Sequence, residues 1–283
     1  MSRGRRLSAA LCAVACVVLA PLATAEPEPL PGAARRIVTL APHLAELVHA
    51  AGAGDRLVGV SEWSDYPPGV EMLPRVGNAF QVDQERLAAL APDLVLGWRG
   101  GNPERVLAQL EQRGYRVVAL ETATLEDVAL QLEAIGRLAG TGEAAAQAAR
   151  RYREALAALR AQQSGKAELR VFYQVSWQPL YTIGGRQLIS RVIALCGGRN
   201  VFAEVETLAP AVGLEAVVAR DPQVILGGGS KAGQFDGWQR WSSVSAVAGG
   251  HMYAVDGNLV TRPAPRILAG ARQVCAALDR ARE

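Results

Sequence analysis

The chain reads Glu85-Arg86-Leu87-Ala88-Ala89-Leu90-Ala91-Pro92-Asp93-Leu94-Val95-Leu96-Gly97, and positions 215–227 repeat this pattern as Glu-Ala-Val-Val-Ala-Arg-Asp-Pro-Gln-Val-Ile-Leu-Gly. In each copy an amphipathic stretch leads to a proline, and an apolar triplet follows. Proline cannot continue the hydrogen bonds of a helix and keeps the residue before it out of α geometry. The apolar triplet is typical of a strand buried on both faces of a parallel sheet. The repeat predicts two similar α/β lobes, each with a glutamate, Glu85 or Glu215, in the first turn of a surface helix.

The segments around the two copies follow the order strand, helix, strand. This order predicts mainly parallel sheets with crossover helices, as in two Rossmann-like lobes of the α/β class. Strands are expected at residues 36–40, 57–60, 117–120, 169–175 and 252–255, a helix at 187–195, and a last helix at 266–280.

The middle of the chain consists almost entirely of helix-forming residues from Leu125 to Gln163, with a break at residues 139–142. No strand fits there, so we predict a long bridging helix that allows only small motions between the lobes. The expected domains are an N-terminal lobe at 35–123, the bridging helix at 124–166 and a C-terminal lobe at 167–283.

The first 25 residues have the pattern of a secretory signal peptide. Three arginines precede an apolar run at residues 7–20, and Ala23-Thr24-Ala25 is a small-residue cleavage signal. A run of this length is too short for a stable membrane anchor, which needs about 20 residues. We therefore expect a periplasmic protein cleaved near Ala25, followed by a flexible, proline-rich leader at 26–34. Lipidation of Cys16 is the alternative, although the residues before it fit a lipoprotein signal poorly.

Removal of the signal peptide changes the charge balance and the cysteine count. Three arginines leave, so that 27 basic residues face 27 acidic ones, and nothing favours binding to nucleic acid. Cys196 and Cys275 remain, and an even pair in an oxidising compartment favours one disulfide over two free thiols. A disulfide that closes a loop of this length stabilises a protein by about 4 kcal/mol.

Aromatic side chains gather in the loops that follow the predicted strands, although aromatics make up only 5% of the chain. Ligands of open parallel sheets bind outside the carboxyl ends of the strands. The pattern therefore predicts a cleft between the lobes that stacks a large flat or apolar ligand. The alternative is that some of these rings only pack beneath their own loops. The aromatic candidates are Trp63, Tyr66, Phe80, Trp98, Trp177 and Tyr181.

Signals for catalysis or for a metal site are weak. The chain has no Gly-x-Ser-x-Gly elbow, no His-Glu-x-x-His and no P-loop, and its few histidines are far apart. We therefore expect no enzyme, no catalytic cofactor and no divalent-metal site. His43, in a turn near the expected cleft, could serve as an axial ligand of a bound metal macrocycle, although a polar loop histidine is the commoner case.

The whole mature chain resembles the periplasmic cobalamin-binding proteins that serve ABC importers, within the group that also contains haem- and siderophore-binding proteins. The segments Trp98-Arg-Gly-Gly-Asn and Ser64-Asp-Tyr-Pro-Pro are fairly specific to the cobalamin branch, whereas Pro92-Asp-Leu-Val is shared by the whole group. Further matching segments are Arg36-Ile-Val-Thr-Leu-Ala-Pro, Val58-Gly-Val, Glu85-Arg-Leu, Cys196-Gly-Gly, Asn200-Val-Phe and Pro265-Arg-Ile.

The resemblance implies roles for individual residues. Trp63 and Trp98 match aromatic positions of the ligand cleft, and Glu85 and Glu215 match the two exposed glutamates that dock onto arginines of a dimeric permease. Cys196 and Cys275 match the family disulfide. The loop of the second lobe that touches the ligand corresponds here to Asp256, Gly257, Asn258, Leu259, Val260, Thr261 and Arg262.

Two positions depart from the resemblance. Ala79, next to Phe80, stands where the cobalamin proteins have a tryptophan, and Leu259-Val260-Thr261 replaces bulkier residues. The resemblance as a whole predicts a monomeric binding protein that captures cobalamin, and the two departures leave room for a related corrinoid. Haem or iron-siderophore binding, with His43 or Tyr66 as a haem ligand, is the first alternative, and a periplasmic enzyme on this scaffold is the second.

Overall fold

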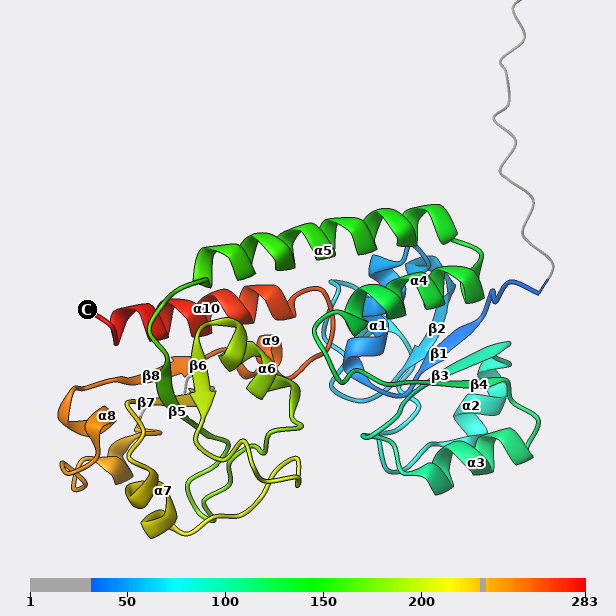
Figure 1. Cartoon of the computed structure of the whole chain (residues 1–283). Helices are drawn as coiled ribbons and strands as arrows, with labels where there is room; N and C mark the ends of the chain where they lie inside the picture. Colours follow the sequence, from blue (N-terminus) through cyan, green and yellow to red (C-terminus); the bar gives the residue numbers. More distant parts are fainter. Residues whose placement is uncertain (1–31, 230–232) are drawn as a thin grey trace, which may run out of the picture.

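Each lobe is built on a four-stranded parallel sheet in the computed structural model of the protein, which describes residues 32–229 and 233–283 (Figure 1). The strand orders are β2-β1-β3-β4 and β6-β5-β7-β8, so the two lobes repeat one topology. Both sheets are entirely parallel. The predicted signal peptide, Cys16 and the first part of the leader lie outside the described residues.

The N-terminal lobe contains the first four strands and three α-helices. In chain order its elements are β1 Ile37–Thr39, α1 Pro42–Ala50, the 3-10 turn η1 Gly54–Arg56, β2 Leu57–Val60, η2 Val70–Met72, α2 Gln84–Leu90, β3 Leu94–Trp98, α3 Glu104–Gln112 and β4 Val117–Leu120. Side chains of β1 and β3 belong alternately to two hydrophobic clusters, one on each face of the sheet, because neighbouring residues of a strand point to opposite faces. Helices α2 and α3 cover one face of the sheet.

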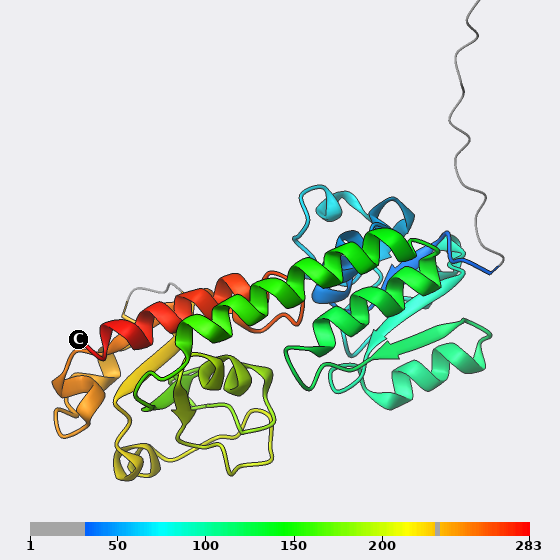
Figure 2. The ribbon, with the colours of Figure 1, turned by 45° about the horizontal axis from the view of Figure 1, so that its top comes forward.

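The predicted bridging helix consists of two helices, α4 Asp127–Ala139 and α5 Gly142–Gln163. The chain turns between them at Gly140, whose left-handed backbone (φ 67°) is accessible to glycine without steric cost. Helix α4 packs against α1 of the N-terminal lobe, and only α5 continues to the other lobe (Figure 2). With 22 residues at 1.5 Å each, α5 is about 33 Å long.

The C-terminal lobe repeats the arrangement and ends in a longer helix that runs beside α5 (Figures 1 and 2). Its elements are β5 Leu169–Gln174, α6 Leu188–Leu195, β6 Gly198–Asn200, α7 Leu214–Arg220, β7 Val224–Gly228, η3 Asp236–Trp238, α8 Ser245–Ala248, β8 Met252–Val255, α9 Gly257–Val260 and α10 Ile267–Arg280. The sequence did not predict β6, and residues 256–262, predicted as a loop, contain the one-turn helix α9.

One hydrophobic cluster passes through both lobes. It contains Leu94 and Leu96 of the first sheet, Leu156 of α5, and Val171 and Leu226 of the second sheet. In the same cluster the hydroxyl of Tyr152 on α5 donates to the carbonyl of Leu125 (2.8 Å), which fixes α5 against the start of α4. The lobes are therefore joined by a packed core as well as by the chain.

The two copies of the repeated sequence fold alike. Helices α2 and α7 each have seven residues, with Glu85 and Glu215 at the second position. Each helix ends at a residue with left-handed geometry (φ 42°), Ala91 or Asp221, and the proline follows directly. A left-handed cap stops the helix and leads the chain into the buried strand β3 or β7. The repeat is confirmed as a structural unit of both lobes.

Candidate functional site

Two hollows lie between the lobes, and residues of both lobes line each of them. The larger one, of about 850 Å³, contains Trp63 and Asp65 from the N-terminal lobe and Asn258 and Arg262 from the C-terminal lobe. The smaller one, of about 150 Å³, is lined by Trp98 and its neighbours on one side and by residues of the C-terminal lobe on the other: Arg186, Gln187, Leu188, Leu208, Thr261 and Pro263. The segment that follows α9 lines both hollows, which together form the candidate ligand cleft.

Trp98 ends strand β3, and the residues after it hold its position. The amide oxygen of buried Asn102 accepts from the Trp98 backbone N–H (2.6 Å), and its amide nitrogen donates to the carbonyls of Ala79 and Leu40 (2.9 and 3.3 Å). The Trp98 ring lies against Gly101 so closely that a Cβ atom there would be 1.8 Å from the ring. The Trp-Arg-Gly-Gly-Asn motif therefore places the indole at the carboxyl end of the sheet, beside β1.

His43 lies beneath Trp98 and is not part of either hollow. The two rings meet edge to face with their centroids 5.0 Å apart, and His43 is 3% exposed. Burial, assisted by the positive charge of Arg262, lowers the pKa of His43 to about 3. Its Nε2 has no hydrogen-bond partner among the described residues. The imidazole is therefore neutral at physiological pH, and Trp98 covers it.

Trp63 is the most open aromatic side chain of the cleft among the described residues, with 78% of it exposed. Its backbone has left-handed geometry (φ 65°), which is rare for a residue other than glycine. The larger hollow gives this indole a free face, so it can stack on a ligand. A hydrogen bond from Arg262 to its carbonyl (3.2 Å) ties the Trp63 loop to the opposite lobe.

Four predicted ligand residues line the hollows together with Trp63. They are Trp98, Asn258, Thr261 and Arg262. Asp256 and Gly257 lie at the start of α9, where the Asp256 carboxylate accepts from the Asn258 backbone N–H, and Gly257 passes close to Gly228. Leu259 packs towards Gly270 and Val260 is completely buried, so Val260 offers no surface to a ligand in this structure.

The other predicted aromatics lie elsewhere. Trp177 packs edge to face on buried Trp238 inside the C-terminal lobe (5.3 Å between centroids). Tyr66 lies under the guanidinium of Arg266, 3.7 Å from its ring centre. Phe80 is 67% exposed and borders an outer groove between α2 and α3. For Trp177, therefore, the packing alternative describes the structure better than a place in the cleft.

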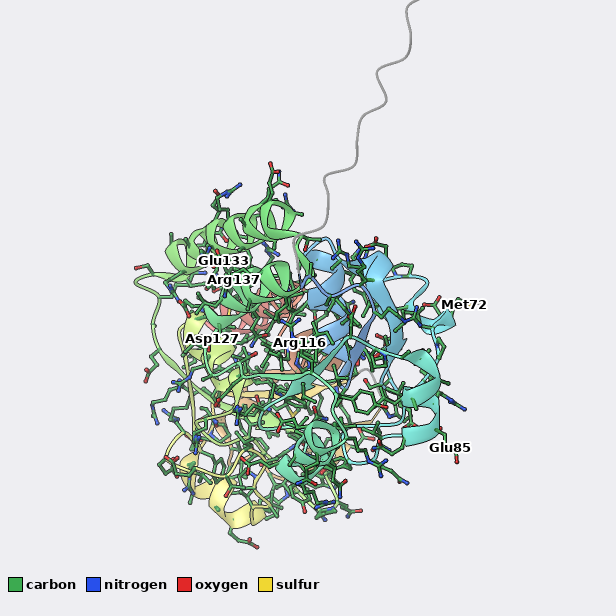
Figure 3. All side chains as sticks on the ribbon, turned by 90° about the vertical axis from the view of Figure 1, so that its right-hand side faces the viewer. Met72, Glu85, Arg116, Asp127, Glu133 and Arg137 are labelled. Carbon is green, nitrogen blue, oxygen red and sulfur yellow. A yellow bond between two sulfur atoms is a disulfide. The ribbon has the colours of Figure 1, made fainter. Side chains whose placement is uncertain are left out.

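The remaining predicted residues have clear positions. Glu85 and Glu215 are exposed on α2 and α7, and Figure 3 shows the Glu85 side chain projecting away from its lobe. Cys196 and Cys275 form the predicted disulfide, which joins the end of α6 to α10. No group of three His, Cys, Asp or Glu residues suited to a metal ion occurs within 32–229 or 233–283.

Several residues that line the cleft or pair beside it were not predicted. Arg99, Glu121 and Arg186 line the smaller hollow, and Glu46 and Arg266 form an ion pair between the lobes. Arg99 could have been found from its place within the Trp-Arg-Gly-Gly-Asn motif. Glu46 offered a weaker signal, because it is a carboxylate on the apolar side of a helix.

Two parallel-sheet lobes, a helix that bridges them and a hollow lined from both sides define a binding protein for a small molecule. The chain belongs to the periplasmic binding protein family, whose family model matches residues 37–259. This membership indicates a periplasmic location and a function in binding. Among the described helices, none combines the length and the apolar character needed to cross a membrane.

Known relatives make the comparison more specific. The chain is 38% identical to the vitamin B12-binding protein of Vibrio cholerae over 265 residues, which is 93% of this chain and 95% of the relative. The crystal structure of periplasmic vitamin B12 binding protein BtuF of Vibrio cholerae superposes with a TM-score of 0.83 at 39% identity, covering 88% of this chain and 98% of that one. A periplasmic heme binding protein from Pseudomonas aeruginosa has a TM-score of 0.74 at 26% identity, covering 86% and 92%.

Proposed function

We propose that this protein captures cobalamin or a closely related corrinoid in the periplasm and delivers it to the permease of an ABC importer. The observation that carries the proposal is the 38% identity with a vitamin B12-binding protein over nearly the full length of both chains. The cleft agrees with this ligand, because a corrin ring is broad and largely apolar and offers flat faces to Trp63 and Trp98. Cleavage near Ala25 releases the mature protein, which acts as a monomer.

Binding requires no covalent chemistry. The indoles stack on the ligand, and the polar groups around them, including Asn258 and Arg262, can bond to amide groups at its edge. The exposed carboxylates of Glu85 and Glu215, one on each lobe, dock onto basic residues of the permease. The ligand then leaves when the permease distorts the arrangement of the two lobes.

A haem ligand is the second candidate, since a heme binding protein shares the fold at 26% identity. Haem is usually held by an axial side chain, and the sequence offered His43 and Tyr66. In the structure His43 is buried behind Trp98, and the guanidinium of Arg266 covers the Tyr66 ring. Neither side chain lines a hollow, which favours the corrinoid.

A titration with cyanocobalamin tests the proposal. We expect micromolar or tighter binding, measured by quenching of tryptophan fluorescence and by isothermal calorimetry. If cyanocobalamin does not bind while haem gives a Soret shift that is lost in His43→Ala, the corrinoid proposal is wrong.

Replacement of Trp63 tests the stacking contact. Because its side chain is 78% exposed, Trp63→Ala should fold normally, and we expect a loss of cobalamin affinity of about tenfold or more, since aromatic anchors carry a large part of binding energy. Leu130→Ala removes an exposed apolar side chain from α4 and should leave the Kd unchanged. Equal affinity of Trp63→Ala and the wild type would remove Trp63 from the site.

A further inference from the structure

A group of charged side chains connects the two lobes beside the larger hollow, which Asp65 and Arg262 line. Glu46 on α1 is 3% exposed, although it carries a carboxylate. Arg266, at the start of α10, donates to both of its oxygens (2.8 and 2.6 Å), and Arg262 approaches it at 3.4 Å. We call Glu46, Asp65, Arg262 and Arg266 the interlobe clasp.

The geometry of the clasp accounts for the burial of its charges. A buried carboxylate is costly unless it is paired and hydrogen-bonded, and the two bonds from one arginine give Glu46 a bidentate partner. The carboxylate is thus held by groups of the other lobe, and it fixes where α10 begins relative to α1.

Arg262 extends the clasp to the cleft surface. Its side chain is 12% exposed and contacts both oxygens of Asp65, one of them at 3.2 Å. It also donates to the Trp63 carbonyl (3.2 Å) and to the Asn258 side chain (3.2 Å). The pKa of Asp65 is lowered, first of all by the hydrogen bond from Arg262, so the carboxylate stays ionised. A C-terminal-lobe arginine therefore holds the N-terminal-lobe loop that carries the exposed indole.

Trp63 needs such support because of its backbone. A residue other than glycine rarely adopts left-handed geometry and keeps it only where the surroundings hold it. Within its own lobe, the loop is held by contacts around Ser61, including its hydroxyl contact with Ser64 (3.2 Å). The bond to the Trp63 carbonyl itself comes from Arg262 of the other lobe.

We infer that Glu46 is a positioning residue for the cleft: by fixing Arg262 and Arg266 it sets the separation of the lobes and the orientation of Trp63 before the ligand arrives. This inference rests on the proposed function for its ligand, and it adds the element that preorganises the site. A site ordered in advance saves the cost of ordering on binding. Opening of the clasp, in turn, loosens both the lobe contact and the aromatic wall of the cleft.

Two variants test the inference. Glu46→Gln keeps the shape of the side chain and removes the charge, and Asp65→Asn weakens only the outer part, where the side chain is 56% exposed. We expect the Kd for cyanocobalamin to rise about tenfold in Glu46→Gln and about threefold in Asp65→Asn, since the cost of ordering the cleft is now paid on binding. Glu133→Gln breaks an Arg–Glu pair of the same length between α4 and α5, away from the cleft, and should leave the Kd unchanged.

Lobe separation provides a readout that does not depend on the ligand. Spin labels at Ala89→Cys on α2 and Ala219→Cys on α7, both exposed, report the distance between the lobes in the ligand-free protein. We expect a broader distance distribution in Glu46→Gln and an unchanged one in Glu133→Gln. Wild-type distributions and affinities in Glu46→Gln and Asp65→Asn would overturn the inference. If Glu46→Gln does not fold, an unchanged Kd for cyanocobalamin in Asp65→Asn overturns the inference by itself.

Failure of the proposed function would look different. If cyanocobalamin does not bind to the wild type, the corrinoid assignment falls, while the distance distributions of Glu46→Gln and the wild type still decide whether the clasp sets the lobes.

Discussion

His43 shows how the cleft wall opposes the protonation of a single side chain. Its pKa falls from 6.5 to about 3 because burial removes water from the charged form, and Arg262 adds repulsion. The unfolded chain takes up a proton at about pH 6.5, whereas the folded protein does so only near pH 3. The free energy of unfolding should therefore decrease as the pH falls through this window, by about 1.4 kcal/mol per pH unit.

The variant His43→Leu isolates this effect. It removes the titrating group and keeps an apolar side chain of similar size beneath Trp98, so the decrease between pH 6.5 and 3 should become shallower than in the wild type. Urea denaturation at several pH values measures it, with His49→Gln, at an exposed position of the same helix, as the control. Parallel pH profiles of the wild type and His43→Leu would show that His43 does not contribute.

Some residues of the candidate site could be predicted from the sequence, and others could not. Trp63 and Trp98 could be placed in the candidate cleft because Trp63 follows β2, Trp98 ends β3, and both match a known pattern. Glu46 could not be assigned, since its partner Arg266 lies 220 positions away and a charge on an apolar helix face does not name its counterion. The sequence places Trp177 in the cleft because it follows a strand. A ring in such a loop can turn either outward or onto its own lobe, and here it lies on Gly237.

At the scale of elements, the sequence predicted most accurately the strands that consist of a short apolar run. The runs at 57–60, 117–120 and 252–255 match β2, β4 and β8 residue for residue. Strand β6 was missed because Gly-Arg-Asn has low strand propensity and pairs only at the sheet edge. The bridge became two helices because the Gly140 cap reverses the chain, and α9 formed because the Asp256 side chain caps a single turn.

The disulfide joins two elements of the C-terminal lobe, and its removal tests their contribution to stability. Cys196 follows α6, Cys275 lies in α10, and both are buried, with 79 residues of sequence separation. Reduction, or the pair Cys196→Ala and Cys275→Ala, should lower the free energy of unfolding by about 4 kcal/mol, because the unfolded chain regains the entropy of an open loop of this length. Urea denaturation with and without reductant measures the change. An unchanged midpoint after reduction, verified by thiol counting, would contradict it.

At the scale of the molecule, α5 and the shared core limit how far the lobes can move. Helix α5 lies along both lobes beside α10, and its side chains belong to the hydrophobic cluster that reaches both sheets (Figures 1 and 2). Large hinge motions would expose this cluster to water at a cost that grows with the apolar area. While the interlobe clasp is closed, the shared core therefore keeps the separation between α2 and α7 nearly constant, which makes Glu85 and Glu215 a pair at a fixed spacing.

A fixed pair of carboxylates predicts bivalent docking. Once one lobe is bound, the second contact forms within the complex, so each glutamate raises the effective concentration of the other. We expect Glu85→Ala or Glu215→Ala alone to weaken cobalamin uptake in cells, and the double variant to reduce it by about 100-fold or more. Affinity for cyanocobalamin should stay at the wild-type value in all three, because both side chains are exposed on α2 and α7 and line neither hollow.

The control for this experiment is Glu143→Ala. Glu143 is also an exposed carboxylate in the first turn of a helix, but it lies on α5, so its loss changes the same local helix energetics without touching α2 or α7. Uptake of labelled cobalamin in a strain that lacks its own binding protein measures the effect. Normal uptake by the double variant would contradict the docking role. Glu85 and Glu215 would then only stabilise the first turns of α2 and α7.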